Sequence, residues 1–164
     1  MRNKVLAGTL AVAIAAAIYF GFFARSDEEQ IRKAVARLAH AVEVRPDDSN
    51  VIVRTARVRS ELNEVLDENV HVSVPELTNL RQGRREVAEA ASQASLAYRS
   101  AEIDVADLQI KFDPTHESAK AGGRATLRAT TRAGEDRRDM RAVDFLLRKD
   151  GGAWRITSVT VWPH

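Results

Sequence analysis

The C-terminal stretch Ala153–Pro163, which reads AWRITSVTVWP, constrains the fold of this chain most strongly. Counting every second residue divides its apolar side chains between two faces, with Trp154, Ile156 and Trp162 on one and Val159 and Val161 on the other. A strand with apolar residues on both faces is typical of the interior of a sheet. The sequence therefore predicts a final strand that other elements flank and cover.

Three earlier segments alternate between apolar and polar residues in the same way. The alternating apolar residues are Leu108, Ile110 and Phe112, then Ala125, Leu127 and Ala129, then Val143, Phe145 and Leu147. Turn signals separate the segments at Asp113–Thr115, Ala133–Asp136 and Asp150–Gly152. Four successive strands with short connections predict an antiparallel meander that ends the chain.

Helical patterns come before these strands. Ser26 and Glu29 fit a capping box, and Asp27 and Glu28 suit the positive end of a helix dipole. A second helix is predicted around Val58–Leu66, a short strand at Val70–Val74, and a third helix at about Arg84–Arg99. The apolar stripe expected on the third helix is Val87, Ala90, Ala91, Ala94, Ala97 and Tyr98, with Leu96 off the stripe. Helices followed by strands predict an α+β domain over residues 26–164.

The N-terminal residues 1–25 contain an uncharged apolar run, Val5–Ala24. Twenty helical residues span roughly 30 Å, which is the thickness of the hydrocarbon core of a bilayer. We expect a transmembrane anchor over residues 5–24, with a cleaved signal sequence as the alternative. Because long domains are exported largely regardless of their charge, the expected location is a single-pass protein of the cell inner membrane with its domain facing the periplasm or exterior.

Charge and composition argue against several classes of protein and site. Without Arg2 and Lys4 the chain has 23 basic and 23 acidic residues, which argues against a nucleic-acid partner. The absence of cysteine excludes disulfides and cysteine-based zinc sites. The four histidines are scattered, and Gly122-Gly123 lacks the lysine of a phosphate-binding loop, so we expect no metal and no cofactor.

Two motifs resemble the nuclear transport factor 2-like superfamily, including its SnoaL-like and ketosteroid-isomerase-like members. Pro75-Glu76-Leu77 followed by Gly83–Val87 (GRREV) resembles the passage from a hairpin into a helix, and Gly152–Thr157 (GAWRIT) is similar to the closing strand of that superfamily. The resemblance implies a cystatin-like, cone-shaped roll of three helices packed on a curved antiparallel sheet, here preceded by one transmembrane helix. The layout also resembles VirB-eight-type components of secretion machines.

Asp144 is the candidate catalytic residue. It shares a strand face with three apolar residues, Met140, Ala142 and Leu146. A carboxyl group on such a face is a candidate general base, the role that the resemblance to the isomerases implies. The alternative is an ion pair with an arginine of an adjacent strand, Arg128 or Arg155. Tyr98 is the candidate oxyanion donor, and a core residue with a satisfied hydroxyl is its alternative.

The candidate ligand-pocket residues are Trp154, Trp162, Met140 and Leu146, with core or interface packing as the alternative for the two tryptophans. The leading hypothesis is a non-enzymatic, membrane-tethered binding or assembly module. It would bind another protein or a small apolar ligand in the cone, and it would form a homodimer through the open sheet face. The alternatives are a small SnoaL-like isomerase or cyclase with Asp144 as its base, and a VirB-eight-like scaffold.

Overall fold

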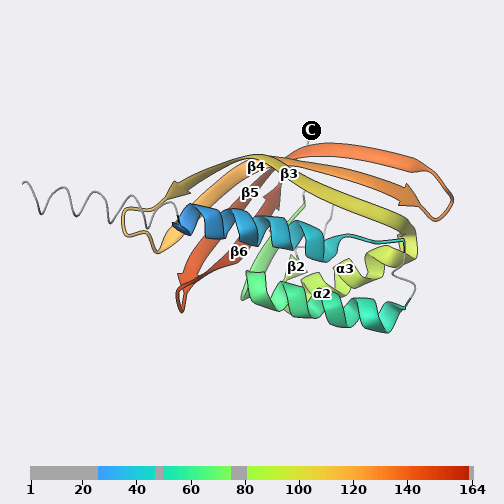
Figure 1. The fold of residues 1–164 in the computed structure, drawn as a ribbon, viewed down its shortest axis with the longest axis horizontal. Coiled ribbons are helices and arrows are strands. Elements are labelled where there is room, and N and C mark those ends of the chain that lie inside the picture. The colour runs from blue at the N-terminus through green and yellow to red at the C-terminus, as the bar shows by residue number, and fades with distance from the viewer. Residues whose placement is uncertain (1–25, 47–49, 75–80, 163–164) are drawn as a thin grey trace, which may run out of the picture.

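The final strand, β6 (Ala153–Val161), lies inside a six-stranded sheet, as the sequence predicts. In the computed structural model, which describes residues 26–46, 50–74 and 81–162, three helices run along one side of this curved sheet (Figure 1). After the first helix (residues 26–42), the elements are α2 (Val51–Val65), β1 (Leu66–Ser73), β2 (Arg81–Gln82), α3 (Arg84–Ala97), β3 (Tyr98–Phe112), β4 (Ser118–Thr131), β5 (Asp136–Asp150) and β6.

The expected membrane anchor, residues 5–24, lies outside the described residues. Within residues 26–46, 50–74 and 81–162, no helix combines the length and the apolar character needed to cross a bilayer.

The strands follow the order β2-β1-β6-β5-β4-β3. The antiparallel meander from β3 to β6 is confirmed. Its strands are paired along most of their length, up to the residue pairs Phe112↔Ala119 and Asp150↔Ala153 beside two of the turns. The expectation of an antiparallel sheet is wrong at β1, which pairs parallel to β6. The chain passes through α3 and the whole meander between these two strands, which lets them run in the same direction. The two-residue strand β2 pairs antiparallel with β1.

A β-bulge in β6 changes which residues share a face. Leu147 pairs with Ile156 and Leu146 pairs with Ser158, so Thr157 is an extra residue that opposes no partner. Side chains after the bulge therefore exchange faces relative to a simple count of two. Trp154, Ile156 and Val159 are buried on the helix side, whereas the Trp162 side chain is 48% exposed. The prediction that β6 is apolar on both faces is wrong for this reason.

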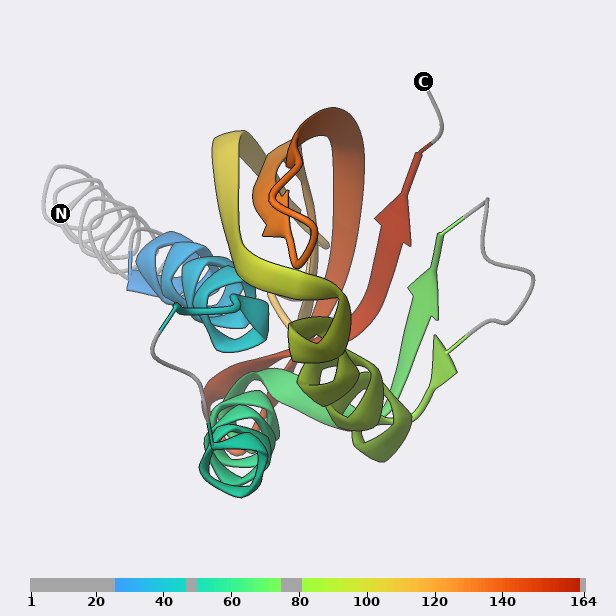
Figure 2. The ribbon, with the colours of Figure 1, turned by 90° about the vertical axis from the view of Figure 1, so that its right-hand side faces the viewer.

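All three helices lie on one side of the sheet, which we call the inner face (Figure 2). Their buried apolar residues belong to the same core as those of the sheet. In α2 the predicted residues Val58, Leu62 and Val65 are buried. Arg54 of the same helix is also buried, with 1% of its surface exposed. Its guanidinium donates to the carbonyl oxygens of Glu43 at 2.7 Å and Ala91 at 2.9 Å, and so joins the segment after the first helix to α3.

The buried stripe of α3 differs from the alanine stripe that the sequence predicts. The buried residues are Ala88, Ser92 and Ser95, while Leu96 is exposed as expected. The two serines can be buried because their hydroxyls donate to carbonyl oxygens of their own helix. Ser92 donates to Ala88 at 2.7 Å, and Ser95 donates to Ser92 at 3.0 Å. Small side chains at these positions let α3 pack closely. Hydropathy alone ranks serine below alanine, and for this reason the sequence pattern favours the alanines as the buried stripe.

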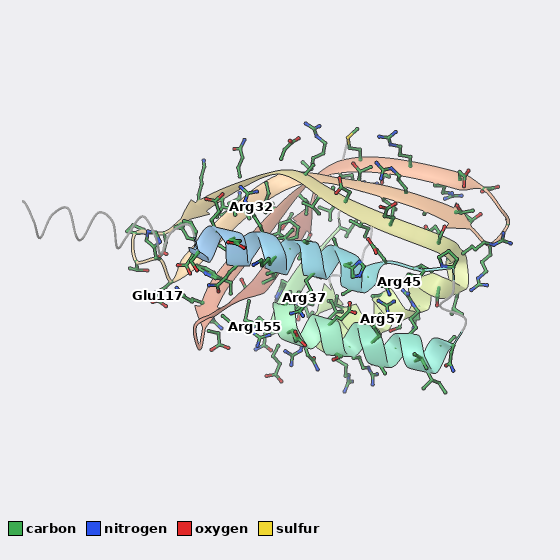
Figure 3. The ribbon with its side chains drawn as sticks, viewed as in Figure 1. Arg32, Arg37, Arg45, Arg57, Glu117 and Arg155 are labelled. Atoms are coloured by element: carbon green, nitrogen blue, oxygen red, sulfur yellow. The ribbon has the colours of Figure 1, made fainter. Side chains whose placement is uncertain are left out.

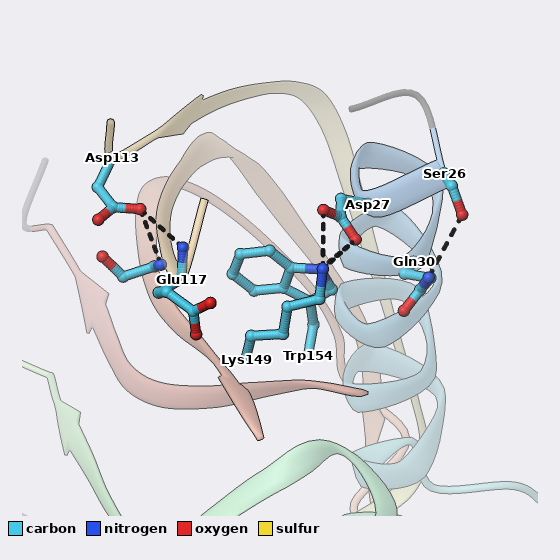
Figure 4. Close-up of polar contacts among 8 residues, drawn as sticks. Ser26, Asp27, Gln30, Asp113, Glu117, Lys149 and Trp154 are labelled. Carbon is cyan, nitrogen blue, oxygen red and sulfur yellow. Dashed lines mark hydrogen bonds and ion pairs between the residues drawn. The ribbon is translucent and has the colours of Figure 1, made fainter. Parts of the chain in front are cut away.

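A buried polar cluster fixes the start of the first helix on the sheet (Figure 4). Asp27, expected only to favour the helix dipole, is 4% exposed and accepts two bonds of 3.0 Å from Lys149 Nζ and one of 3.1 Å from the indole nitrogen of Trp154. The Lys149 ammonium also lies 5.6 Å from the centre of the Trp154 ring. Farther along the same helix, Arg37 reaches Glu64 of α2 at 2.5 Å (Figure 3).

Candidate functional site: an apolar cavity under the sheet

A cavity of about 250 Å³ lies between the first helix, α3 and the inner face of the sheet. All of the side chains that line it are apolar. They are Val35, Leu38, Ala39 and Val42 of the first helix, Leu66 and Val72 of β1, Val87 of α3, Ile103 and Val105 of β3, Ala125 of β4, Val143 and Phe145 of β5, and Val159 and Val161 of β6. Several of them, including Leu38 and Val87, are only partly buried, so the cavity reaches the surface.

The local structure of each element explains why these residues meet. The four residues of the first helix recur at helical spacing and form one stripe. On β5, Val143 and Phe145 are two positions apart and point to the same face. On β6, the bulge at Thr157 turns Val159 and Val161 toward the helices. The cavity is the space that remains where a curved sheet and straight helices do not fully interdigitate.

The lining determines what the cavity can do chemically. No polar or charged side chain of the described residues lines it, so it offers no general acid, general base or oxyanion donor. Among the residues that the structure describes, no group of three or more histidine or acidic side chains is placed to hold a metal ion. An engineered apolar cavity of about 150 Å³ binds benzene, which has six carbon atoms. In proportion, the cavity of about 250 Å³ in this protein suits an apolar molecule of about ten non-hydrogen atoms.

Asp144 lies on the opposite face of the sheet from this cavity. Its neighbours Val143 and Phe145 point inward, so Asp144 points away from the helices. Its Oδ2 atom accepts from Lys120 Nζ at 2.9 Å and from the indole nitrogen of Trp162 at 3.1 Å. The ion pair that we considered as an alternative is therefore present, but it is made with a lysine rather than an arginine.

The structure does not bring Asp144 and Tyr98 together. Tyr98 is the first residue of β3 and pairs with Thr131, whereas Asp144 pairs with Gly122 on the same neighbouring strand, β4. These two β4 positions are nine residues apart, which corresponds to about 30 Å along a strand. A base and an oxyanion donor at that separation cannot act on one substrate.

The four predicted pocket residues do not line the apolar cavity. Trp154 is buried on the inner face beside Asp27. Met140, Leu146 and Trp162 are 44%, 48% and 48% exposed and lie on the other side of the sheet, which we call the outer face. Strict alternation of side chains along β6 predicts both tryptophans on one face of the sheet. The bulge at Thr157 moves Trp162 to the opposite face from Trp154.

Sequence reasoning identified most of the lining residues only as core. The spacing of Val35, Leu38 and Val42 and the alternation of Val143 and Phe145 mark inward-facing positions. Nothing in that pattern separates a side chain that lines a cavity from one in a fully packed core. The curvature of the sheet decides this, and curvature depends on bulges and glycines that periodicity does not reveal.

The chain matches no known sequence family, and no curated protein matches it in sequence. Solved structures do match. A nuclear transport factor 2-like superfamily protein from Salmonella enterica has a TM-score of 0.66 and 12% identity, over 85% of this chain and 92% of that one. A nuclear transport factor 2-like protein with a cystatin-like fold from Novosphingobium aromaticivorans has a TM-score of 0.64 and 16% identity, over 85% and 83%.

A protein described as a scytalone dehydratase, also from Novosphingobium aromaticivorans, has a TM-score of 0.61 and 11% identity, over 83% of each chain. At such low sequence identity, the structural similarity establishes the fold and leaves the activity open. The cone of three helices on a curved sheet, the motifs around Gly83 and Trp154, and these similarities agree. The chain has the nuclear transport factor 2-like, cystatin-like fold.

Proposed function

We propose that this domain is a non-enzymatic module that binds a small apolar molecule in the cavity under its sheet. The observation that carries the proposal is a cavity of about 250 Å³ lined only by apolar side chains. Burial of apolar surface is the favourable term that such a lining offers a ligand. A substrate that needs proton transfer would find no titratable group among the described residues of the lining.

We propose further that residues 5–24 tether the domain to the inner membrane, with the domain on the periplasmic side. The support is the uncharged run of twenty residues after Arg2 and Lys4. Membrane fractionation and N-terminal sequencing of the mature protein test this proposal. An intact N terminus in the membrane fraction is the expected result, and a mature chain that begins near Arg25 would contradict it.

Methyl NMR of the full-length chain in detergent micelles tests ligand binding. Naphthalene, which has ten carbon atoms, is the probe. We expect saturable shift changes at the methyl groups of Val143 and Val159, which line the cavity, and none at Val70, which is buried outside it. Because the readout is specific to each methyl group, partition of naphthalene into the micelle does not mimic binding.

Two alanines of the first helix provide matched variants. Ala39 is buried and lines the cavity, whereas Ala36 is exposed and does not line it. Ala39→Leu should fill part of the cavity and abolish the shift changes, while Ala36→Leu should leave them intact. Circular dichroism verifies that both variants fold. Shift changes that persist in Ala39→Leu, or that never appear in the unmodified chain, would refute the binding proposal.

A further inference from the structure

β3 lies at one edge of the sheet, and β2 lies at the other. The segment after the first helix covers only the beginning of β3, where Val44 and Ala101 exchange two backbone hydrogen bonds of 2.9 Å. Beyond this bridge, no strand of the described residues pairs with the open side of β3. A long edge strand presents unpaired N–H and C=O groups, which form a template for another strand.

The bridge at Val44 determines which backbone groups of β3 point outward. In an antiparallel ladder, successive residues direct their N–H and C=O groups alternately to one side and to the other. Ala101 directs both groups at Val44, and the register of β3 against β4 is regular from there to residue 106. Ile103 and Val105 therefore direct their groups to the open edge, where no described residue bonds to them. Asp104, between them, directs its groups at β4.

A cleft of about 360 Å³ lies between this part of β3 and the first helix (Figure 2). Ala36 and Ala39 line it on the helix side, and their small side chains leave room beside the strand. Ile103, Val105 and Ala39 line both this cleft and the apolar cavity. Apolar side chains of an added strand would therefore pack between β3 and the helix, over the mouth of the cavity.

The charged groups around the cleft leave one charge without a partner. On the helix side, Arg32 forms an ion pair with Glu28 at 2.7 Å, and the Glu43 carboxylate contacts the ring of His40 at 2.9 Å. On β3, Asp104 is exposed and forms no ion pair with any described residue. The open edge therefore carries an uncompensated negative charge.

The neighbours of Asp104 on the outer face do not alter this balance. Asp104 points to the outer face because Ile103 and Val105, on either side of it, point inward. Two other acidic residues of β3 lie 3.5–3.9 Å from arginines of β4, in the pairs Glu102–Arg128 and Asp107–Arg124. A basic side chain on an added strand would pair with Asp104, and opposite charges on neighbouring strands stabilise their pairing.

We propose that the edge of β3 around residues 103–105 binds an extended segment of a partner protein in which apolar and basic residues alternate. The segment adds a strand to the sheet and bonds to the backbone of Ile103 and Val105. Consecutive side chains of a strand point to opposite faces, so the apolar ones enter the cleft and a basic one lies beside Asp104. The proposal uses the strand edge and does not depend on a small molecule in the cavity.

Hydrogen exchange of backbone amides, measured by NMR on the full-length chain in micelles of an uncharged detergent, tests the proposal. The probe is a seven-residue peptide that alternates valine with lysine, and the control peptide alternates valine with glutamate. The lysine peptide should slow exchange at Ile103 and Val105 about tenfold and leave Asp104, whose amide already faces β4, unchanged. The glutamate peptide should bind about fivefold more weakly. No slowing at Ile103 and Val105, or equal binding of the two peptides, would overturn the proposal.

A charge variant tests the role of Asp104. Asp104→Lys should remove the preference for the lysine peptide, because it replaces the unpaired negative charge with a positive one. Asp150→Lys is the matched control, since Asp150 is exposed at the turn between β5 and β6 and should leave the preference intact. A preference that survives Asp104→Lys would contradict the assigned charge recognition.

A backbone variant tests the strand pairing itself. Val105→Pro removes one N–H that faces the open edge and no bond to β4, a position at which an edge strand accepts proline. It should abolish the slowed exchange at Ile103. Val105→Ala is the matched control, because it shortens the same side chain, keeps the N–H group and should retain the slowed exchange. Circular dichroism verifies that both variants fold. Equal exchange at Ile103 in the two variants would show that the peptide does not pair with β3.

Discussion

The buried ion pair between Asp27 and Lys149 determines how the first helix sits on the sheet. Asp27 lies at the start of the helix and Lys149 near the end of β5, 122 residues later. The carboxylate accepts three hydrogen bonds, two from the ammonium and one from the Trp154 indole. Because this helix supplies one wall of the apolar cavity, weakening the pair should affect both the stability of the domain and the shape of its candidate site.

The expected loss in the free energy of unfolding depends on which partner of the ion pair is removed. Lys149→Met leaves a carboxylate that is 4% exposed with only an indole donor, and an uncompensated buried charge of this kind costs about 3–5 kcal/mol. Asp27→Asn should cost less, about 1.5–3 kcal/mol, because the Lys149 side chain is 25% exposed and can still reach water. Asp27→Leu combined with Lys149→Met removes both charges and should recover part of the loss.

Urea unfolding of the full-length protein, followed by far-ultraviolet circular dichroism, measures these free energies. The control is Lys33→Met, which removes an ion pair with Glu29 on the exposed side of the same helix and should leave the midpoint unchanged. The reasoning would be refuted if Lys149→Met lowered the midpoint no more than Lys33→Met. It would also be refuted if the double variant lost the full sum of the losses measured for Asp27→Leu and for Lys149→Met singly, since that sum indicates no coupling.

Three further outcomes are expected. Arg54→Ala should lower the free energy of unfolding by about 3–5 kcal/mol in urea titrations, because two partly buried carbonyl oxygens lose a charged donor and the buried Arg54 side chain leaves a cavity. Gly123→Ala should destabilise the domain more than Gly122→Ala in the same assay, because the new methyl group meets a backbone carbonyl of β3 at 2.9 Å rather than the end of a flexible carboxylate. The pKa of Asp113 lies below its usual value because its carboxylate accepts bonds from the Thr115 hydroxyl and from backbone N–H groups, so the stability that it contributes is present above the ordinary pKa and is lost as the pH falls through the lowered one. Carboxyl NMR titration should show a midpoint for Asp113 below that of an unperturbed aspartate, and this midpoint should move up in Thr115→Ala.

Local patterns were sufficient for most elements of the fold. The meander was predictable because residues such as Val143, Phe145 and Leu147 alternate over a long strand between clear turn signals. The second helix was predictable because Val58 and Leu62 recur at helical spacing. Both patterns reflect burial on one face, which a sequence records directly.

Features that depend on distant partners were not predictable. Threonine is common in regular strands, so nothing in the sequence marks Thr157 as a bulge. Only the register of β6 against β5 reveals it. Asp27 was interpreted from its position in a helix, since nothing near it in sequence indicates a lysine from β5. The parallel pairing of β1 with β6 also depends on the path of the whole chain. The candidate cavity follows from such long-range geometry.

Alternate residues of β5 belong to the two faces of the sheet. Val143 and Phe145 line the cavity, while Asp144 points to the outer face, where it contacts Lys120 and Trp162. A strand of this kind orients both surfaces rigidly, because a shift of one residue would move every side chain to the opposite face. Filling the cavity is therefore expected to leave the outer face of the sheet unchanged, since it does not require β5 to move. Ala39→Leu, which fills the cavity from the first helix, should leave the NMR resonance of the Trp162 indole N–H on the outer face unchanged, and a shifted resonance would indicate that the sheet bends when the cavity is filled.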